Sequence, residues 1–293
     1  MFFKTLELLL FLMIIIVKQI SANYFCELTC PRGPNTVCLR NDLKCSASSA
    51  CGTKFKMMPF DDRTRNLILN LHNELRNELA LGNDKRGGNG VAANMRALSY
   101  DKEIEFVAQC YANACRDMGN HDKCRRTKKF KSVGQNMYAL EASDSFNFND
   151  DKWIKEAINQ WYIEITDTNT NDIDKFQQSD RLIGHFTQMV WAETTHIGCG
   201  RTIFGSGPST KMSIYCNYGT GGNVLNRGVY ARGPPCSQCG SAKCNNQYKG
   251  LCGDVEDLKN DKWVPPFGLG RGASTRSSLL ISMVLTYISV LLM

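Results

Sequence analysis

Residues 184–191 read Gly-His-Phe-Thr-Gln-Met-Val-Trp, and the triplet Gly198-Cys199-Gly200 follows a few positions later. A second block, Ile-Tyr-Cys-Asn-Tyr-Gly-Thr-Gly-Gly-Asn-Val, occupies residues 214–224. The two blocks hold histidine, tryptophan, cysteine, asparagine and tyrosine at fixed offsets, a combination that chance rarely produces. They therefore indicate a defined fold and a defined site, although they name no reaction.

The residues around these blocks predict an antiparallel hairpin. Apolar and polar side chains alternate over 197–204 and over 212–218, and a turn rich in glycine and proline separates the two stretches. Cys199 and Cys216 would then lie close to each other across the hairpin, where they could form a disulfide.

Three helices are expected upstream of the hairpin. The first begins at Asp61 or Asp62 and ends at Gly82, and the second runs from about 101 to 118. The third begins near Asp150 or Asp151. Helices followed by a hairpin predict an α+β fold in which the helices pack on an antiparallel sheet. The apolar stripes expected to face the core are Leu67, Ile68, Leu71, Leu75 and Leu79 in the first helix, Ile104, Val107, Ala108, Tyr111, Ala112 and Cys115 in the second, and Ile154, Ile158, Trp161 and Ile165 in the third.

Together the two blocks resemble the signatures of the CAP superfamily. This superfamily contains the cysteine-rich secretory proteins, the insect venom allergens called antigen five and the plant pathogenesis-related proteins. The resemblance covers residues 24–252 and implies a three-layer α-β-α sandwich with a small antiparallel sheet, rich in disulfides. The triplet Gly134-Gln135-Asn136, the run 121–125 and the early Tyr24-Phe25-Cys26 are most similar to the antigen five branch.

The resemblance also implies a central cleft lined by two histidines and two acidic residues. Carried over position by position, these residues are His121, His185, Glu164 and Gln135, where the last replaces the glutamate of the family pattern. His121, His185 and Glu164 match the ligand types of a zinc site with an open position. The alternative is a structural network of hydrogen bonds. We expect no required cofactor. Under the metal-site hypothesis, the cleft binds zinc or another divalent metal weakly.

The remaining histidines carry less information. His72 lies on the first helix, one residue from the apolar seam, and is expected to be buried and hydrogen-bonded. No partner for His196 can be named from the sequence.

The 14 cysteines all follow the N-terminal apolar segment, and their even number predicts complete pairing in an oxidising compartment. The resemblance implies the pairs Cys26–Cys38, Cys30–Cys124, Cys51–Cys115 and Cys199–Cys216, and it leaves Cys45 and Cys110 as a further pair to test. Cys236, Cys239, Cys244 and Cys252 would close among themselves in an order that stays open. Their Cys-x-x-Cys spacing also fits a zinc knuckle, which is the alternative there.

Composition divides the chain into six segments. A lysine, an unbroken apolar run and small residues predict a signal peptide that is cut after Ala22. Small residues, a polar spacer and an apolar tail match a GPI-anchor signal, with a tail-anchored span and a plain terminal tail as alternatives. The segments are a signal peptide at 1–22, a disulfide-rich N-terminal cap at 23–60, the CAP domain at 61–232, a cysteine-rich, hinge-like extension at 233–252, a linker at 253–278 and a hydrophobic C-terminal tail at 279–293.

Charge and apolar surface suggest partners. The formal net charge of +7 is a mild basic bias that does not indicate nucleic acid. Six basic residues crowd into 123–131, and this stretch is either a solvated loop or a contact for a heparin-like chain or anionic lipid. Broad apolar helix faces beside the polar loop 141–151 could leave a channel for a lipid or sterol, ligands that several CAP relatives bind.

Two functions are weighed. The first is a secreted or surface-anchored binding module without catalysis, whose partner is a lipid or sterol, an extracellular protein or receptor, or a host target. It would contact membrane only through a C-terminal lipid anchor. The second is a metal-assisted hydrolase, a protease or esterase, that uses His121, His185 and Glu164. The sequence contains no Gly-x-Ser-x-Gly nucleophile elbow, which favours the first function.

Overall fold

The computed structural model describes residues 24–40, 44–116, 120–143, 147–148 and 151–265. The expected signal peptide at 1–22 and the expected hydrophobic tail at 279–293 lie outside these residues. Among the described helices, none is both long enough and apolar enough to cross a membrane.

A long hairpin forms the centre of the sheet. Strands β4 (His196–Phe204) and β5 (Ser209–Gly219) pair antiparallel, and Cys199 lies opposite Cys216 in the register. The two cysteines form a disulfide across the strands. The hairpin predicted from the alternation is therefore confirmed.

The sheet has a third long strand that the sequence analysis did not predict. Strand β3 (Val133–Ser143) pairs antiparallel with β5 along its whole length and forms one edge of the sheet. Its first half carries the polar residues Gln135 and Asn136, which interrupt the apolar alternation expected of a strand. The short strands β1 (Lys56–Met57) and β2 (Ser99–Tyr100) both pair with β4.

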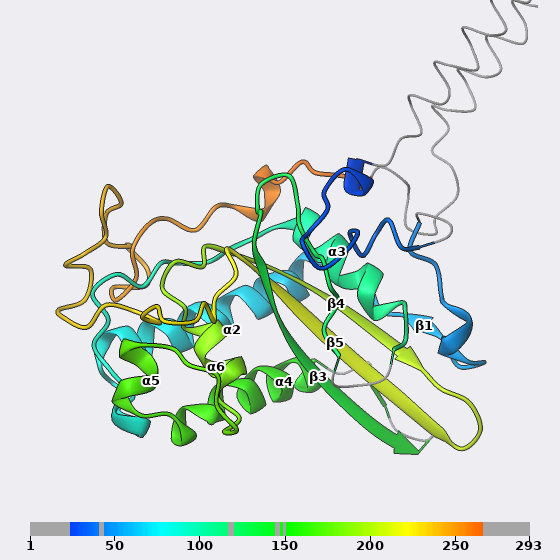
Figure 1. Ribbon diagram of the computed structural model, residues 1–293, viewed down its shortest axis with the longest axis horizontal. Coiled ribbons are helices and arrows are strands. Elements are labelled where there is room, and N and C mark those ends of the chain that lie inside the picture. The colour runs from blue at the N-terminus through cyan, green and yellow to red at the C-terminus, as the bar shows by residue number, and fades with distance from the viewer. Residues whose placement is uncertain (1–23, 41–43, 117–119, 144–146, 149–150, 266–293) are drawn as a thin grey trace, which may run out of the picture.

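Helices cover both faces of the sheet, which gives the three-layer α-β-α sandwich that the sequence implied (Figure 1). Helix α3 (Lys102–Ala112) lies very close to one face, because a Cβ added at Gly198 would be 2.3 Å from the backbone nitrogen of Glu105. The other face carries the main apolar core. The helices on that side are α2 (Asp62–Leu81), α4 (Lys152–Ile163) and the short α6 (Gly184–Met189).

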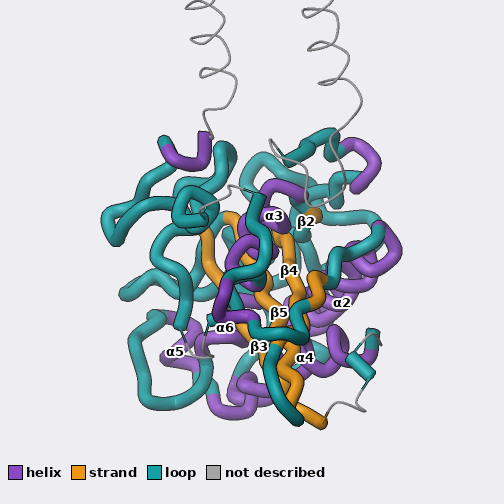
Figure 2. Tube along the Cα trace, turned by 90° about the vertical axis from the view of Figure 1, so that its right-hand side faces the viewer, coloured by secondary structure: helices purple, strands orange, loops and turns teal. Residues whose placement is uncertain are grey.

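The remaining elements are short and lie in the connections, which make up much of the chain (Figure 2). They are the helix α5 (Thr170–Asp174) and the 3-10 turns η1 (Tyr24–Cys26), η2 (Ser49–Cys51), η3 (Arg86–Gly88), η4 (Glu164–Asp167) and η5 (Leu258–Asn260). Loops of this kind supply little apolar surface, so disulfides carry much of the constraint.

Helix α2 has the predicted ends but a shifted buried face. The side chain of Asp61 accepts a hydrogen bond from the Thr64 backbone, and Gly82 ends the helix in the left-handed conformation. The most deeply buried side chains on this helix are Ile68, His72, Asn73, Arg76, Leu79 and Ala80, each fully buried. The leucine stripe at 67, 71 and 75 is only half-buried, because polar side chains that bond to core backbone occupy the centre of the face.

Helix α3 is shorter than the predicted span of 101–118. It ends at Ala112, and Asn113 donates a side-chain hydrogen bond of 2.7 Å to the Cys45 carbonyl. The chain then turns so that Cys115, which was expected on the helix, reaches Cys51 of the N-terminal cap. The disulfide to the cap therefore accounts for the end of the helix before Cys115.

All 14 cysteines are paired. The bonds Cys26–Cys38, Cys30–Cys124, Cys51–Cys115 and Cys199–Cys216 are those that the resemblance implied. The two remaining cysteines of the domain do form the tentative pair Cys45–Cys110, and Cys236–Cys244 and Cys239–Cys252 complete the set. The zinc-knuckle interpretation of the last four is wrong. The sulfurs of Cys236, Cys239 and Cys252 do lie near one another, but disulfide sulfurs are not the thiolates that zinc binds.

The stretch 253–265, expected to be part of a linker, packs on the domain instead. Asp261 accepts a hydrogen bond of 2.7 Å from the Lys102 backbone at the start of α3. The ring of Trp263 lies 5.4 Å from that of Phe106, and its indole N–H donates to the Tyr24 hydroxyl at 3.2 Å. Aromatic burial and a helix-terminal carboxylate thus hold this segment against α3 and the N-terminal cap.

Buried His72 gives a pH-dependent stability that can be measured. Its Nδ1–H donates to the Ile68 carbonyl at 2.8 Å, and its Nε2 accepts from the Tyr218 hydroxyl at 3.0 Å. Burial lowers the pKa of His72 to about 4 from an ordinary value of 6.5. Between these values the unfolded chain binds a proton that the native state does not, so stability present above pH 6.5 is lost as the pH falls toward 4.

We expect the variant His72→Gln to lose part of this acid sensitivity. The wild-type free energy of unfolding should drop by about 3 kcal/mol from this residue between neutral pH and pH 4. His196, whose pKa burial also lowers to about 4, acts in the same direction, whereas the pKa of Asp101, raised by burial to about 6, acts against it. Urea unfolding at pH 7, 5.5 and 4.5 measures the slope, and an identical slope in the variant contradicts the assignment.

Candidate functional site

The edge strand β3 brings the two predicted cleft histidines together. Oε1 of Gln135 lies 2.8 Å from Nδ1 of His121. Nδ2 of Asn136, the next residue along the strand, donates to the His185 carbonyl at 2.9 Å. The charge of His185 acts on the pKa of His121, so the two imidazoles lie near each other. The triplet 134–136 therefore contacts both cleft histidines.

Glu164 orients His185 and caps the helix that carries it. Its Oε1 accepts a hydrogen bond of 2.6 Å from Nδ1 of His185. Its Oε2 accepts the backbone N–H groups of His185 at 2.8 Å and Phe186 at 3.1 Å, which are free donors at the start of α6. The ring of Trp161 stacks on the imidazole with centroids 6.3 Å apart. Every hydrogen bond of this carboxylate thus serves α6 and its histidine.

The two imidazoles face solvent while their partners lie beneath them. The side chain of His185 is 32% exposed and that of Glu164 is 10% exposed. His121 is exposed and Gln135 is buried. Desolvation lowers the pKa of His121, and the nearby charges of Arg125 and His185 lower it further. His121 is therefore neutral at physiological pH, which is the form that binds a metal.

Both cleft imidazoles place Nδ1 against an oxygen acceptor, Gln135 for His121 and Glu164 for His185. Gln135 Oε1 and the Glu164 carboxylate can only accept, so both Nδ1 atoms carry a proton, and in a neutral ring Nε2 is then the nitrogen with a lone pair. In the described part of the chain, His121, Glu164 and His185 do not form a compact cluster of three ligand atoms. Glu164 Oε1 lies only 2.6 Å from Nδ1 of His185, so the position of His121 keeps the three ligand atoms from meeting. Metal-binding histidines usually have their second nitrogen fixed in this way, so the pair fits such a site.

Comparison with known proteins decides the family. A family model described as "Cysteine-rich secretory protein family" (CAP) matches residues 69–218. The chain is 34% identical to "Venom allergen-1" of Aedes aegypti over 85% of its own length and 94% of that protein. The chain belongs to the CAP family. It is also 39% identical to "Venom allergen 3" of Solenopsis invicta over 60% of its length and 76% of that protein, which supports the insect venom-allergen branch.

Solved structures of related proteins show the same fold. The structure described as "Crystal structure of NaASP2 with Zn2+" superposes on this CAP protein with a TM-score of 0.53 at 31% identity, covering 66% of this chain and 96% of that one. "Structure of BmVAL-1" gives a TM-score of 0.54 at 28% identity, covering 67% of this chain and 96% of that one. CAP relatives are typically secreted, and with the seven disulfides this indicates an extracellular protein.

His196 has partners in this CAP protein that its sequence did not reveal. Its Nε2 lies 2.7 Å from the Lys129 ammonium and 3.6 Å from a carboxylate oxygen of Glu256, and its Nδ1 contacts the Thr195 hydroxyl. Burial and the charge of Lys129 lower the pKa of His196. This histidine joins three distant segments and takes no part in the cleft. No local pattern could have found it, because its partners come from the loop after α3 and from the packed C-terminal stretch.

Two surface hollows lie away from the cleft. One of about 580 Å³ is bordered by the ion pairs Arg227–Glu193 and Arg232–Asp174, each 2.7 Å long. The other, of about 410 Å³, shares Arg232. The first hollow is lined mainly by polar groups, whereas the second, on the glycine-rich turn after α2, is lined mainly by apolar atoms. The loop 141–151, where a lipid channel was expected, begins with the last residues of β3, and residues 144–146 and 149–150 lie outside the described ones.

Proposed function

We propose that this CAP protein is a secreted, non-enzymatic binding protein whose cleft binds a divalent cation such as zinc. The observation that carries the proposal is the shared arrangement of His121 and His185. Each ring uses Nδ1 to donate to a partner below it, through Gln135 at 2.8 Å and Glu164 at 2.6 Å. Each Nε2 is then left as the unprotonated nitrogen of the ring, the form that binds metal. The relative described with Zn2+ shares the fold at 31% identity, which adds support.

Two ligands make a weak and open site. Structural zinc sites have four protein ligands, and catalytic sites usually have three with one open position. A cation held by two imidazoles keeps positions for water or for a donor group of a target molecule. The ion would therefore serve binding to an extracellular partner more readily than it would stabilise the fold.

The alternative hydrolase finds little support in the geometry. Water activation at a metal needs a base next to it, yet Glu164 already accepts three hydrogen bonds from α6 and His185. Thr187, the hydroxyl nearest in sequence to His185, is fully buried and donates to the Ile183 carbonyl at 2.9 Å. Neither residue is placed to act as a general base or as a nucleophile at the exposed Nε2 atoms.

A zinc titration tests the proposed cation site. We expect the wild type to bind zinc, and His121→Ala and His185→Ala each to weaken binding by about tenfold or more. His196→Ala is the matched control, because it removes a histidine outside the cleft and should leave zinc affinity unchanged. Calorimetry gives the affinity, and imidazole nitrogen chemical shifts identify the ligand atom. Equal zinc affinity in the wild type and in both cleft variants would refute the site, and zinc-dependent turnover of a peptide or ester library would refute the non-enzymatic assignment.

The biological target and the anchor remain predictions. If the protein binds a lipid or sterol, organic extraction of the purified protein should release that molecule. A protein that is empty and takes up neither lipid nor sterol contradicts this prediction. A receptor or host protein remains an equal candidate. If a GPI anchor holds the protein at the cell surface, a phosphoinositide-specific lipase should release the protein from cells.

A further inference from the structure

The basic loop, residues 123–131, is an ordered element of the surface. Its buried positions recur every third residue, at Cys124, Thr127 and Phe130, and continue at Val133 at the start of β3. These side chains are 2%, 1%, 7% and 9% exposed, respectively. Of the basic residues between these anchors, Lys128, Lys129 and Lys131 are exposed, whereas Arg125 and Arg126 are half-buried. Buried anchors therefore alternate with basic residues along the loop.

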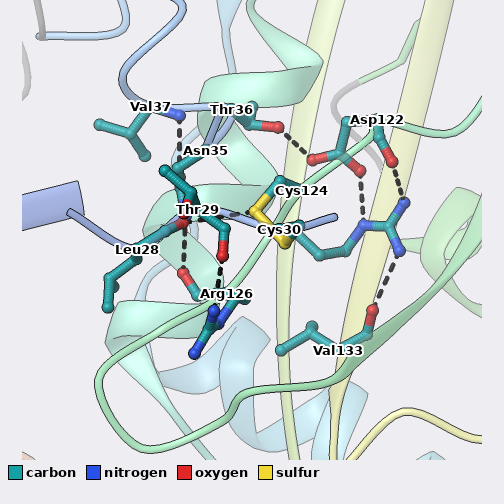
Figure 3. The surroundings of a disulfide bond; sticks show 11 residues. Leu28, Thr29, Cys30, Asn35, Thr36, Val37, Asp122, Cys124, Arg126 and Val133 are labelled. Atoms are coloured by element: carbon teal, nitrogen blue, oxygen red, sulfur yellow. Dashed lines mark hydrogen bonds and ion pairs between the residues drawn. A yellow bond between two sulfur atoms is a disulfide. The ribbon is translucent and has the colours of Figure 1, made fainter. Parts of the chain in front are cut away.

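Several contacts fix the loop in this shape. Cys124 is bonded to Cys30 of the N-terminal cap, and the Cys124 carbonyl accepts the Thr36 backbone N–H at 2.8 Å (Figure 3). The Thr127 hydroxyl accepts the Phe130 backbone N–H at 3.0 Å. The ring of Phe130 fills the space above Gly219, where an added Cβ would be 2.6 Å from the ring. Holding a loop in place before binding lowers the entropic penalty of an encounter.

Only some of the cations are engaged internally. Arg125 is paired with Asp122 and also donates to the Val133 carbonyl, while Lys129 contacts His196 and Glu256. Lys123, Lys128 and Lys131 are exposed. The Lys128 ammonium lies 4.1 Å above the Tyr24 ring, which leaves it at the surface beside the cap.

The N-terminal cap and the loop backbone add two arginines to the same surface. Arg32 is exposed next to Gly33, and a Cβ added at Gly33 would lie 3.9 Å from the side chain of Lys123. Arg126 is half-buried and donates to the Thr29 carbonyl (Figure 3). The basic face is thus defined as Arg32, Lys123, Arg126, Lys128 and Lys131. Asp122, the acidic residue within the adjoining stretch 120–131, is neutralised by Arg125.

We propose that the basic face binds a linear sulfated polysaccharide of the heparin type. The extracellular setting separates the protein from nucleic acids and from the anionic inner leaflet of the cell membrane. Sulfated glycans are the polyanions that such a protein meets outside the cell. The exposed cations of this loop and of the neighbouring cap match the repeated negative charges of such a chain, and opposite charges favour both encounter and binding. The proposal is independent of the cation site in the cleft.

A binding experiment with a matched control tests this proposal. The basic-face variant carries Lys123→Gln, Lys128→Gln and Lys131→Gln, and the control carries Lys155→Gln, Lys175→Gln and Lys249→Gln, three exposed lysines on α4, after α5 and in the C-terminal extension. Both variants lose the same charge. By the counterion-release relation for polyanions, the basic-face variant should bind heparin about 10- to 100-fold more weakly near physiological salt. Its salt-dependence slope should fall by about 2 to 3 units, while the control stays close to wild type.

The same measurements include the outcomes that overturn the proposal. If the basic-face variant binds heparin as tightly as the wild type, this loop is not the binding site. If the control variant loses as much heparin affinity as the basic-face variant, heparin is attracted by the net charge of the protein alone. Stronger binding to phosphatidylserine vesicles than to heparin assigns the face to a membrane, and equal binding to unsulfated hyaluronan shows that sulfate is not recognised. An unchanged melting temperature verifies that the exposed substitutions leave the fold intact.

Discussion

Replacing Arg76 by methionine is expected to lower the free energy of unfolding by about 4 kcal/mol, a severe effect for one residue outside the cleft. The guanidinium is fully buried and donates to the backbone carbonyls of Arg96 at 2.6 Å, Met189 at 2.7 Å and Trp191 at 3.0 Å. It also reaches the Thr194 carbonyl at 3.3 Å. Methionine fills similar space but donates nothing, so these buried acceptors would lose their partner.

Among the residues that the structure describes, no carboxylate pairs with this arginine, which makes it unusual. Burial lowers the pKa of Arg76 to about 9, so the side chain still carries its charge at neutral pH. Carbonyl dipoles from the segment before β2 and from the connection between α6 and β4 take the place of a counter-ion. Arg76 thus connects α2 by hydrogen bonds to the segment before β2 and to the connection between α6 and β4. Its loss should therefore also destabilise the end of the sheet next to α6.

Urea unfolding and secretion yield are the measurements for Arg76→Met. The control is Arg63→Met on the same helix, because Arg63 is 69% exposed and its ion pair with Asp151 should contribute less than about 1 kcal/mol. Similar losses for both variants would show that the length or charge of the helix matters and that the carbonyl network does not.

The case of Arg76 shows why the sequence predicted α2 correctly but misplaced its buried face. Helix ends depend on local caps such as Asp61 and Gly82, and these are visible in the chain. Periodicity, by contrast, counts apolar residues, so it selected the leucines and did not include Arg76 in the buried face. A buried polar residue can be predicted only when its partners are known, and these lie more than a hundred positions away in part.

The same distinction applies to the cleft and to the C-terminal stretch. The family pattern located His121, Gln135, Glu164 and His185, but it could not give their roles, because the groups that donate to Glu164 depend on where α6 begins. Strand β3 was missed since its polar residues hold the histidines and so break the strand alternation. Trp263 was assigned to a linker because its stretch has no periodic pattern, although its aromatic contacts fix it against α3.

Replacing Glu164 by alanine is expected to lower the free energy of unfolding by about 3 kcal/mol and to weaken zinc binding at the proposed site. Three hydrogen bonds end on this carboxylate, two of them from backbone groups at the start of α6. Without it, these buried donors have no acceptor and the His185 ring is free to turn. A single substitution therefore affects both the fold and the cleft.

The variant Glu164→Gln separates these two roles. Its amide oxygen can still accept from the backbone N–H groups of His185 and Phe186, so stability should fall by only about 1 kcal/mol. Its NH₂ group would face Nδ1 of His185, however, and would draw the imidazole into the tautomer protonated on Nε2. That proton occupies the position where a cation would bind, so zinc affinity should fall by about tenfold although the fold is retained. Nitrogen chemical shifts of His185 report the tautomer directly. If Glu164→Gln binds zinc as tightly as the wild type, the carboxylate only caps α6, and the assignment of the cleft as a site tuned for metal fails.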